Sequence, residues 1–246
     1  MGKNQVYILV AGGCLLAFCG VGALLIGILY IAPRFADQFN TAPNVVNVTS
    51  NPRPNAKGNS MGDPNALIHI EEFGDFQCPF CQRFHNETEP FLVDEYIKTG
   101  KVYFTYHSMG NWVSQNIGSG NTESQDAASA AYCAMDQNKF WEYHDMLFGN
   151  LLGENVGSFS DHRLTAIAET MGLDMNDFND CNNSSKYKEL VQDDYNTGLS
   201  IGIQGTPTFR LTYKVNSETK IVTIEGAQPF EAFQQELDAI LKEIGE

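Results

Sequence analysis

The stretch FGDFQCPFC, residues 73–81, places two cysteines, Cys78 and Cys81, on either side of two other residues. The apolar run before it, residues 66–73, is typical of a buried strand, and residues 82–99 have apolar side chains at helical spacing. A cysteine in the first turn of a helix faces unpaired backbone N–H groups and the positive end of the helix dipole, which favour a thiolate. We therefore expect Cys78 to be a nucleophile and Cys81, one turn later, to form a disulfide with it.

A single C-x-x-C pair also matches half of a zinc site. A structural zinc site needs two more soft ligands, but Cys133 and Cys181 are single and far apart, and neither a second C-x-x-C nor an H-x-x-x-H occurs. We therefore favour redox chemistry and expect no metal and no cofactor. A metal-binding membrane protein remains the alternative that a zinc analysis would decide.

A second stretch, GIQGTPTF at residues 202–209, precedes another apolar segment. The succession of strand, CPFC motif, helix and late Gly-Thr-Pro-Thr-Phe resembles the DsbA-like branch of the thioredoxin superfamily. The resemblance implies an α/β thioredoxin fold with a helical insertion. It also implies that Pro207 follows a cis peptide bond and faces the active-site cysteines, with Thr206 before it. The Pro-Phe pair between the cysteines departs from the Pro-His of the best-known members, and a phenylalanine side chain cannot hydrogen-bond to a thiolate.

Glu72 lies six residues before Cys78, where DsbA-like proteins often carry an acidic residue beneath the disulfide. The resemblance implies that a buried Glu72 has a raised pKa and relays a proton to Cys81. Strand alternation leaves the opposite assignment open, with Glu71 facing inward and Glu72 exposed, because a slip of one residue reverses the two faces.

The resemblance covers nearly all of residues 66–246, and we expect one DsbA-like domain at 63–246 with a helical insertion at about 110–200. Cys133 and Cys181 both fall in this insertion. An even pair of cysteines in an exported domain suggests a structural disulfide, and some DsbA-like proteins carry a second bridge at similar positions. Two separate buried thiols are the alternative. The other predicted elements are strands 101–108, 208–214 and 220–225, and helices 125–137, 139–152, 161–171, 175–180, 185–198 and 230–244.

An apolar run at residues 6–32 precedes this domain, with Lys3 before it. As a helix it would span about 40 Å, enough to cross a bilayer. A signal peptide would have a shorter apolar core and a small-residue cleavage site, and this run fits both features poorly. We therefore expect a membrane anchor at residues 1–35, embedded in lipid through 6–32, and a flexible linker at 36–62, where Asn, Pro, Ser, Thr and Gly replace periodic apolar residues.

Charge excludes one class of partner. The chain has 15 Lys and Arg against 30 Asp and Glu, a net charge of −15, and nucleic-acid binding requires a basic surface. We therefore expect no nucleic acid among its partners. The resemblance implies an exported, membrane-tethered thiol:disulfide oxidoreductase that oxidises reduced secreted proteins outside the cell membrane. It also suggests a membrane partner that re-oxidises the protein, similar to DsbB or to vitamin K epoxide reductase. A reductase or isomerase of the same fold, or a non-catalytic binding or chaperone module, are the alternatives.

Overall fold

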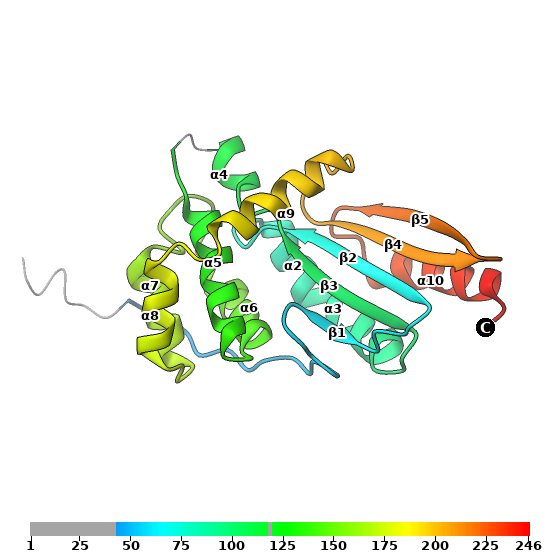
Figure 1. Ribbon diagram of the computed structural model, residues 1–246, viewed down its shortest axis with the longest axis horizontal. Helices are drawn as coiled ribbons and strands as arrows, with labels where there is room; N and C mark the ends of the chain where they lie inside the picture. The colour runs from blue at the N-terminus through cyan, green and yellow to red at the C-terminus, as the bar shows by residue number, and fades with distance from the viewer. Residues whose placement is uncertain (1–42, 118–119) are drawn as a thin grey trace, which may run out of the picture. The chain divides into compact units, whose positions relative to one another are not determined.

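The computed structural model describes residues 43–117 and 120–246, whose arrangement is shown in Figure 1. A five-stranded sheet with the order β1-β3-β2-β4-β5 forms its centre. β2 and β3 are parallel, as expected for strands joined by a helical crossover, and the other neighbouring strands are antiparallel. The strands are β1 (Ser60–Gly62), β2 (Ile68–Gly74), β3 (Val102–Ser108), β4 (Thr208–Val215) and β5 (Glu218–Glu225).

The segment that follows the C-x-x-C motif differs from the single helix predicted for residues 82–99. Helix α2 (Pro79–Glu87) begins earlier, and α3 (Glu89–Leu92) and a π-helical turn (Val93–Ile97) continue the chain. Pro90 accounts for the break, because proline has no N–H to donate to the carbonyl group four residues earlier. The C-terminal helix α10 (Phe230–Ile244) has the predicted bounds and contacts α3 and β4.

The helical insertion is confirmed between β3 and β4, and its helices gather at one end of the sheet in Figure 1. α5 lies at its centre and contacts α4, α6, α7, α8 and α9. Aromatic residues of α6 such as Trp141, Tyr143 and His144 are buried, so they form core. The helices are α4 (Trp112–Ile117), which was not predicted, α5 (Glu123–Asp136), α6 (Phe140–Gly149), α7 (Asp161–Thr170), α8 (Met175–Asn183) and α9 (Lys188–Ser200).

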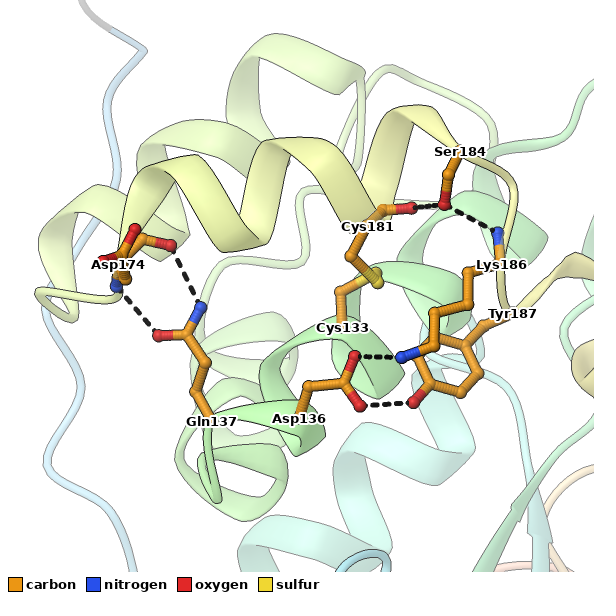
Figure 2. The surroundings of a disulfide bond; sticks show 8 residues. All are labelled: Cys133, Asp136, Gln137, Asp174, Cys181, Ser184, Lys186 and Tyr187. Carbon is orange, nitrogen blue, oxygen red and sulfur yellow. Dashed lines mark hydrogen bonds and ion pairs between the residues drawn. A yellow bond between two sulfur atoms is a disulfide. The ribbon is translucent and has the colours of Figure 1, made fainter.

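A disulfide between Cys133 on α5 and Cys181 on α8 joins two helices of the insertion, as Figure 2 shows, so the predicted bridge is confirmed. Polar pairs flank it on both sides. Gln137 exchanges two hydrogen bonds with the backbone of Asp174, and Asp136 accepts hydrogen bonds from Lys186 and Tyr187. The bridge therefore reinforces a contact that the polar groups also make.

Removing this bridge should destabilise the domain without stopping its chemistry. In the chain-entropy model, a bridge across a separation of 48 residues contributes about 4 kcal/mol to the free energy of unfolding. The double substitution Cys133→Ala/Cys181→Ala should lower that free energy, measured by urea denaturation, by up to this amount. Asp136→Asn is a control that breaks a partly exposed ion pair and should cost less than about 1 kcal/mol. An unchanged urea midpoint in the double variant would contradict the prediction.

Residues 44–53, here called the docking arm, lie against α6 and correct the linker prediction. Val46 donates its N–H to Asn150 Oδ1 (2.7 Å) and accepts from Asn150 Nδ2 (2.9 Å). Gly149 is needed for this approach, because a Cβ there would lie 2.3 Å from Val48 Cγ2.

Residues 54–62 of the expected linker are also ordered. The backbone carbonyl of Asn44 accepts a hydrogen bond from Arg163, and residues 60–62 form the edge strand β1, paired with β3. The prediction of a flexible linker at residues 36–62 is therefore wrong for 44–62, because side chains of the domain satisfy the backbone groups of this segment.

The anchor expected at residues 6–32 lies outside the described residues. Within residues 43–117 and 120–246, no helix is both long enough and apolar enough to cross a bilayer.

Candidate active site

The two cysteines lie where β2 gives way to α2, with Pro79 at the first helical position. Cys78 is the N-cap residue with an extended backbone, one position earlier than the first-turn placement that we expected. Its exposed fraction is 5%, whereas Cys81 is 0% exposed, and both are free thiols. The arrangement leaves Cys78 as the sulfur that a partner can approach and keeps Cys81 behind it.

The turn that carries Cys78 is held by two buried polar residues that the sequence did not single out. The Asp75 carboxylate accepts from the N–H of Gln77 (2.8 Å) and of Val113 (2.9 Å), and burial raises the pKa of Asp75 to about 6. Gln77 donates in turn to Ser124 on α5 (2.8 Å). These contacts tie the active-site turn to the insertion. The only sequence signal for them was an acidic residue followed by an amide just before the motif.

The loop before β4 lies next to Cys78, as the resemblance implied. The Thr206–Pro207 peptide bond is cis. The Cys78 thiol donates to the carbonyl oxygen of Thr206 at 3.3 Å, and the Thr206 hydroxyl is buried without a partner among the described residues. That hydroxyl is a donor available to a thiolate at Cys78.

The two thiols differ in acidity. A hydrogen bond from Cys81 lowers the pKa of Cys78 to about 7; burial opposes this shift, and donors at Thr206 and the N–H groups of Cys81 and Phe80 support it. Burial and the neighbouring Cys78 raise the pKa of Cys81 well above its ordinary value, although the N–H of Asp75 lies 3.4 Å from its sulfur. At neutral pH, Cys78 is therefore the thiolate and Cys81 the thiol.

We expect the reaction of Cys78 with iodoacetamide in the reduced protein to follow a midpoint near pH 7. Thr206→Val should move this midpoint upward because it removes one donor to the thiolate. Thiolate absorbance of a Cys81→Ala variant should titrate above the pH 7 midpoint, since the hydrogen bond from Cys81 is lost. A wild-type midpoint near the ordinary thiol value, about 8.5, would contradict the prediction.

Glu72, not Glu71, faces inward. Glu72 is 2% exposed on the same side of the sheet as Tyr106, its partner in the pairing of β2 and β3. Glu71 points to the other side, where it forms ion pairs with Arg210 and His107. Burial and the nearby Glu89 raise the pKa of Glu72 well above its ordinary value. A proton-relay role for Glu72 stays a prediction, and Glu72 is near enough to Cys81 for its charge to raise the pKa of that thiol.

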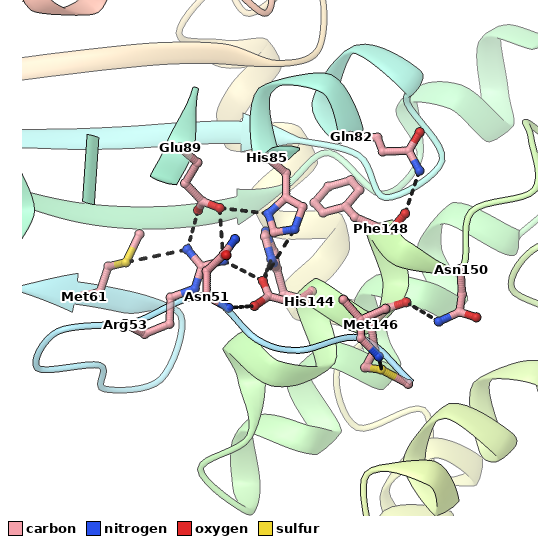
Figure 3. Close-up of polar contacts among 12 residues, drawn as sticks. Asn51, Arg53, Met61, Gln82, His85, Glu89, His144, Met146, Phe148 and Asn150 are labelled. Atoms are coloured by element: carbon pink, nitrogen blue, oxygen red, sulfur yellow. Dashed lines mark hydrogen bonds and ion pairs between the residues drawn. The ribbon is translucent and has the colours of Figure 1, made fainter. Parts of the chain in front are cut away.

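Figure 3 shows a buried charged cluster that sequence reasoning missed, and the charges of its Glu89 and Arg53 act on the pKa of Glu72. Arg53, at the end of the docking arm, forms ion pairs with Glu89 (2.6 Å) on α3 and Asp145 (2.5 Å) on α6, and its guanidinium lies over Trp141. Burial acts to raise the pKa of Glu89, but Arg53 and His85 outweigh it and hold that pKa well below its ordinary value. The spacing of His85 and Glu89 on one helical face was a signal for part of the cluster.

Two observations bear on metal binding. His85, His144 and Asp145 have potential ligand atoms within 4.8 Å of one another, but the Arg53 guanidinium bonds to Asp145, so a positive charge already occupies this position. Cys133 and Cys181 are joined to each other and cannot complete a zinc site with Cys78 and Cys81.

A groove of about 700 Å³ lies beside the site and is lined by the cis-proline loop and by β5. Its lining includes Ile203, Thr206, Pro207 and Thr223. Phe80, within the CPFC motif, is 54% exposed. The surroundings of Cys78 therefore offer apolar side chains and backbone polar groups to a polypeptide.

Comparisons with known proteins agree with this geometry. Residues 55–239 match the family model described as Thioredoxin. The probable disulfide bond formation protein D of Bacillus anthracis is 27% identical over 151 residues, which cover 61% of this chain and 67% of that protein. The crystal structure of Wolbachia pipientis alpha-DsbA1 matches with a TM-score of 0.65 at 22% identity, over 79% of this chain and 94% of that chain. BdbD from Bacillus subtilis matches with a TM-score of 0.62 at 20% identity, over 80% and 100% of the two chains.

Proposed function

Because the chain belongs to the thioredoxin family and is a DsbA-like thiol:disulfide oxidoreductase, we propose that it introduces disulfides into secreted proteins from outside the cell membrane. One observation carries the proposal. An approachable thiol of low pKa, Cys78, lies one helical turn before a buried thiol of high pKa, Cys81, and faces Thr206.

The reaction proceeds in two thiol–disulfide exchange steps, which depend on the different accessibility and acidity of Cys78 and Cys81. A substrate thiolate attacks the sulfur of Cys78 in the Cys78–Cys81 disulfide, and Cys81 leaves with the bonding electrons and takes up a proton. A second substrate thiolate then attacks the substrate sulfur of the mixed disulfide, and Cys78 leaves as a thiolate. The substrate gains a disulfide, and the protein is left with two reduced cysteines. Stabilising the Cys78 thiolate favours the reduced protein and therefore oxidation of the substrate.

A reductase or isomerase of the same fold is the second candidate function, and the pKa of Cys78 is compatible with it. A value of about 7 lies at the weakly stabilised end of the range for such cysteines. The reduction potential of the Cys78–Cys81 couple, measured against glutathione, decides between the two. A value above about −200 mV supports the oxidase, and a value near that of thioredoxin, about −270 mV, overturns it in favour of a reductase. The intact cysteine pair argues against a non-catalytic binding or chaperone module.

The location is also part of the proposal. We place the catalytic domain on the extracytoplasmic side, tethered by residues 6–32, because disulfides persist in oxidising compartments and are reduced in the cytosol. The disulfide Cys133–Cys181 supports this location. A re-oxidising membrane partner similar to DsbB or to vitamin K epoxide reductase would complete the cycle. Protease added to spheroplasts should remove the domain while a cytosolic control protein survives, and full protection of the domain would overturn this topology.

A further inference from the structure

The hydroxyl of Tyr106 is fully buried and makes no hydrogen bond within the described part of the chain. Other buried tyrosines do have partners. Tyr132 donates to Asp194 (2.6 Å), and Tyr143 donates to the carbonyl of Leu164 (2.8 Å). An unpaired buried hydroxyl is unfavourable, and phenylalanine would fill the same space without it. Packing alone therefore does not explain why residue 106 is a tyrosine.

This hydroxyl and the Glu72 carboxylate both lie next to Gly74. Tyr106 on β3 and Glu72 on β2 are paired in register, so their side chains lie on the same face of the sheet. A Cβ on Gly74 would lie 3.1 Å from Glu72 Oε1 and 3.2 Å from the Tyr106 hydroxyl, so both polar atoms border the space that glycine leaves open. The next residue, Asp75, has its N–H 3.4 Å from the sulfur of Cys81. The carboxyl, the hydroxyl and the buried sulfur thus surround one short stretch of backbone.

The ring of Tyr106 is fixed in this position. It stacks on Phe76 at 5.1 Å between ring centroids and meets the edge of His144 at 5.2 Å, and Phe140 lies at 6.0 Å. A ring held on three sides keeps its hydroxyl aimed at one point, which a proton-transfer group requires.

We propose that Tyr106 is a proton-relay residue that completes the proton path between Glu72 and Cys81. The proposal deepens the proposed function and rests on it. Burial and the charges of Cys81 and Glu72 raise the pKa of Tyr106 well above its ordinary value, so the phenol remains protonated and can both donate and accept.

The step conserves every proton. When a substrate thiolate attacks Cys78, the disulfide breaks and Cys81 leaves as a buried thiolate. Tyr106 transfers its phenolic proton toward the Cys81 sulfur and accepts the proton of the Glu72 carboxyl. Cys81 becomes a thiol, Glu72 a carboxylate and Tyr106 a neutral phenol again. In the reverse reaction, the same path removes the proton of Cys81 as it attacks the mixed disulfide.

Several other titratable or charged groups near Glu72, Tyr106 and Cys81 influence the pH dependence of this step, and they come from five parts of the chain. They are Cys78 and Asp75 in the active-site turn, Arg53 from the docking arm, Glu89 on α3, Tyr132 on α5 and His144 on α6.

Tyr106→Phe tests the proposal, because it removes one unpaired hydroxyl and leaves the packing intact. We expect stability to be unchanged or higher, and the Cys78 midpoint to stay near pH 7. The rate at which dithiothreitol reduces the Cys78–Cys81 disulfide, measured by stopped flow between pH 5 and 9, should fall by about tenfold or more. Its pH profile should lose the inflection that Glu72 causes.

Tyr143→Phe is the matched control. It removes a buried hydroxyl that is hydrogen-bonded to Leu164, so it should lower stability and leave the reduction rate unchanged. Glu72→Gln should slow reduction, and adding Tyr106→Phe to it should cost little more, since both residues serve one path. A Tyr106→Phe rate and pH profile equal to wild type, or effects that multiply in the double variant, would overturn the role of Tyr106. Failure of the wild-type protein to exchange disulfides at all would instead remove the proposed function.

Discussion

Replacing Cys78 with serine should abolish disulfide exchange, with a loss of at least about 10³-fold, because no other described thiol is free and approachable. Cys81→Ser should behave differently. Its Cys78 thiolate still attacks substrate disulfides, but no second thiol can displace the substrate, so mixed disulfides accumulate. The measurement is capture of substrate proteins that carry disulfides by each reduced variant, followed by non-reducing electrophoresis and mass spectrometry of the linked peptides.

The control for this comparison is Cys133→Ala/Cys181→Ala, which lacks the other cysteine pair of the domain and should retain exchange. Trapping through Cys81 in a Cys78→Ser variant, with none in Cys81→Ser, would reverse the two roles. The 5% exposure of Cys78 against 0% for Cys81 makes that outcome unexpected.

Arg53→Met should be among the most destabilising single substitutions in the domain. The methionine keeps much of the packing against Trp141, but Glu89 and Asp145 lose the cation that neutralises them in a buried position. Leaving buried carboxylates without their partner costs about 3–5 kcal/mol in the free energy of unfolding. Urea denaturation at pH 7 measures this loss. Arg210→Met is the matched control, because Arg210 pairs with Glu71 at 3.5 Å in a partly exposed position and should contribute less than about 1 kcal/mol.

The effect of pH on this cluster has a definite sign. The pKa of Glu89 is held below its ordinary value, so its stabilising contribution is present above about pH 4 and is lost as the pH falls further. Burial lowers the pKa of His144 to about 4. Unfolded histidine binds a proton near pH 6.5, so wild-type stability should also fall as the pH drops from 6.5 toward 4.

The pH dependence also shows whether Arg53→Met loses stability through unpaired charge or through poorer packing. Without Arg53, the pKa of the Glu89 carboxyl rises, and protonation relieves the unpaired charge. The difference in stability between wild type and Arg53→Met should therefore shrink as the pH falls from 7 to 4.5. A difference that stays constant with pH would show that packing, not charge, explains the loss.

Local patterns were sufficient to predict most elements of the domain. The strand at residues 66–73, the helix at 230–244 and the insertion helices follow from periods of two and 3.6 residues, which depend on neighbours in the sequence. The C-x-x-C pair predicted the redox site for the same reason. Which of Glu71 and Glu72 faces inward could not be decided, because strand alternation fixes the period and leaves the phase to the pairing with β3 and β4.

The structure of the docking arm could not be predicted from local sequence patterns. Its residues have no apolar period, and they are held by individual groups that lie about a hundred positions away in the sequence, such as Asn150 at the end of α6 and Arg163 on α7. Arg53 occurs between two prolines and resembles any solvated residue of a linker. Tyr106 was read correctly as a strand residue, but only the folded surroundings show that its hydroxyl lacks a partner.

The docked arm also determines how many residues connect the proposed membrane anchor to the domain. With the arm attached, the chain between the end of the expected span at residue 32 and the first docked residue, Asn44, is residues 33–43. Fully extended, this chain reaches at most about 40 Å, whereas a chain free through residue 53 would reach about 75 Å. The largest volume that the attachment point can sweep is therefore about sixfold smaller with the arm docked. If residues 6–32 span the membrane as proposed, docking of the arm keeps Cys78 closer to the bilayer and raises its effective concentration for a membrane-embedded oxidant over that for targets deeper in the cell envelope.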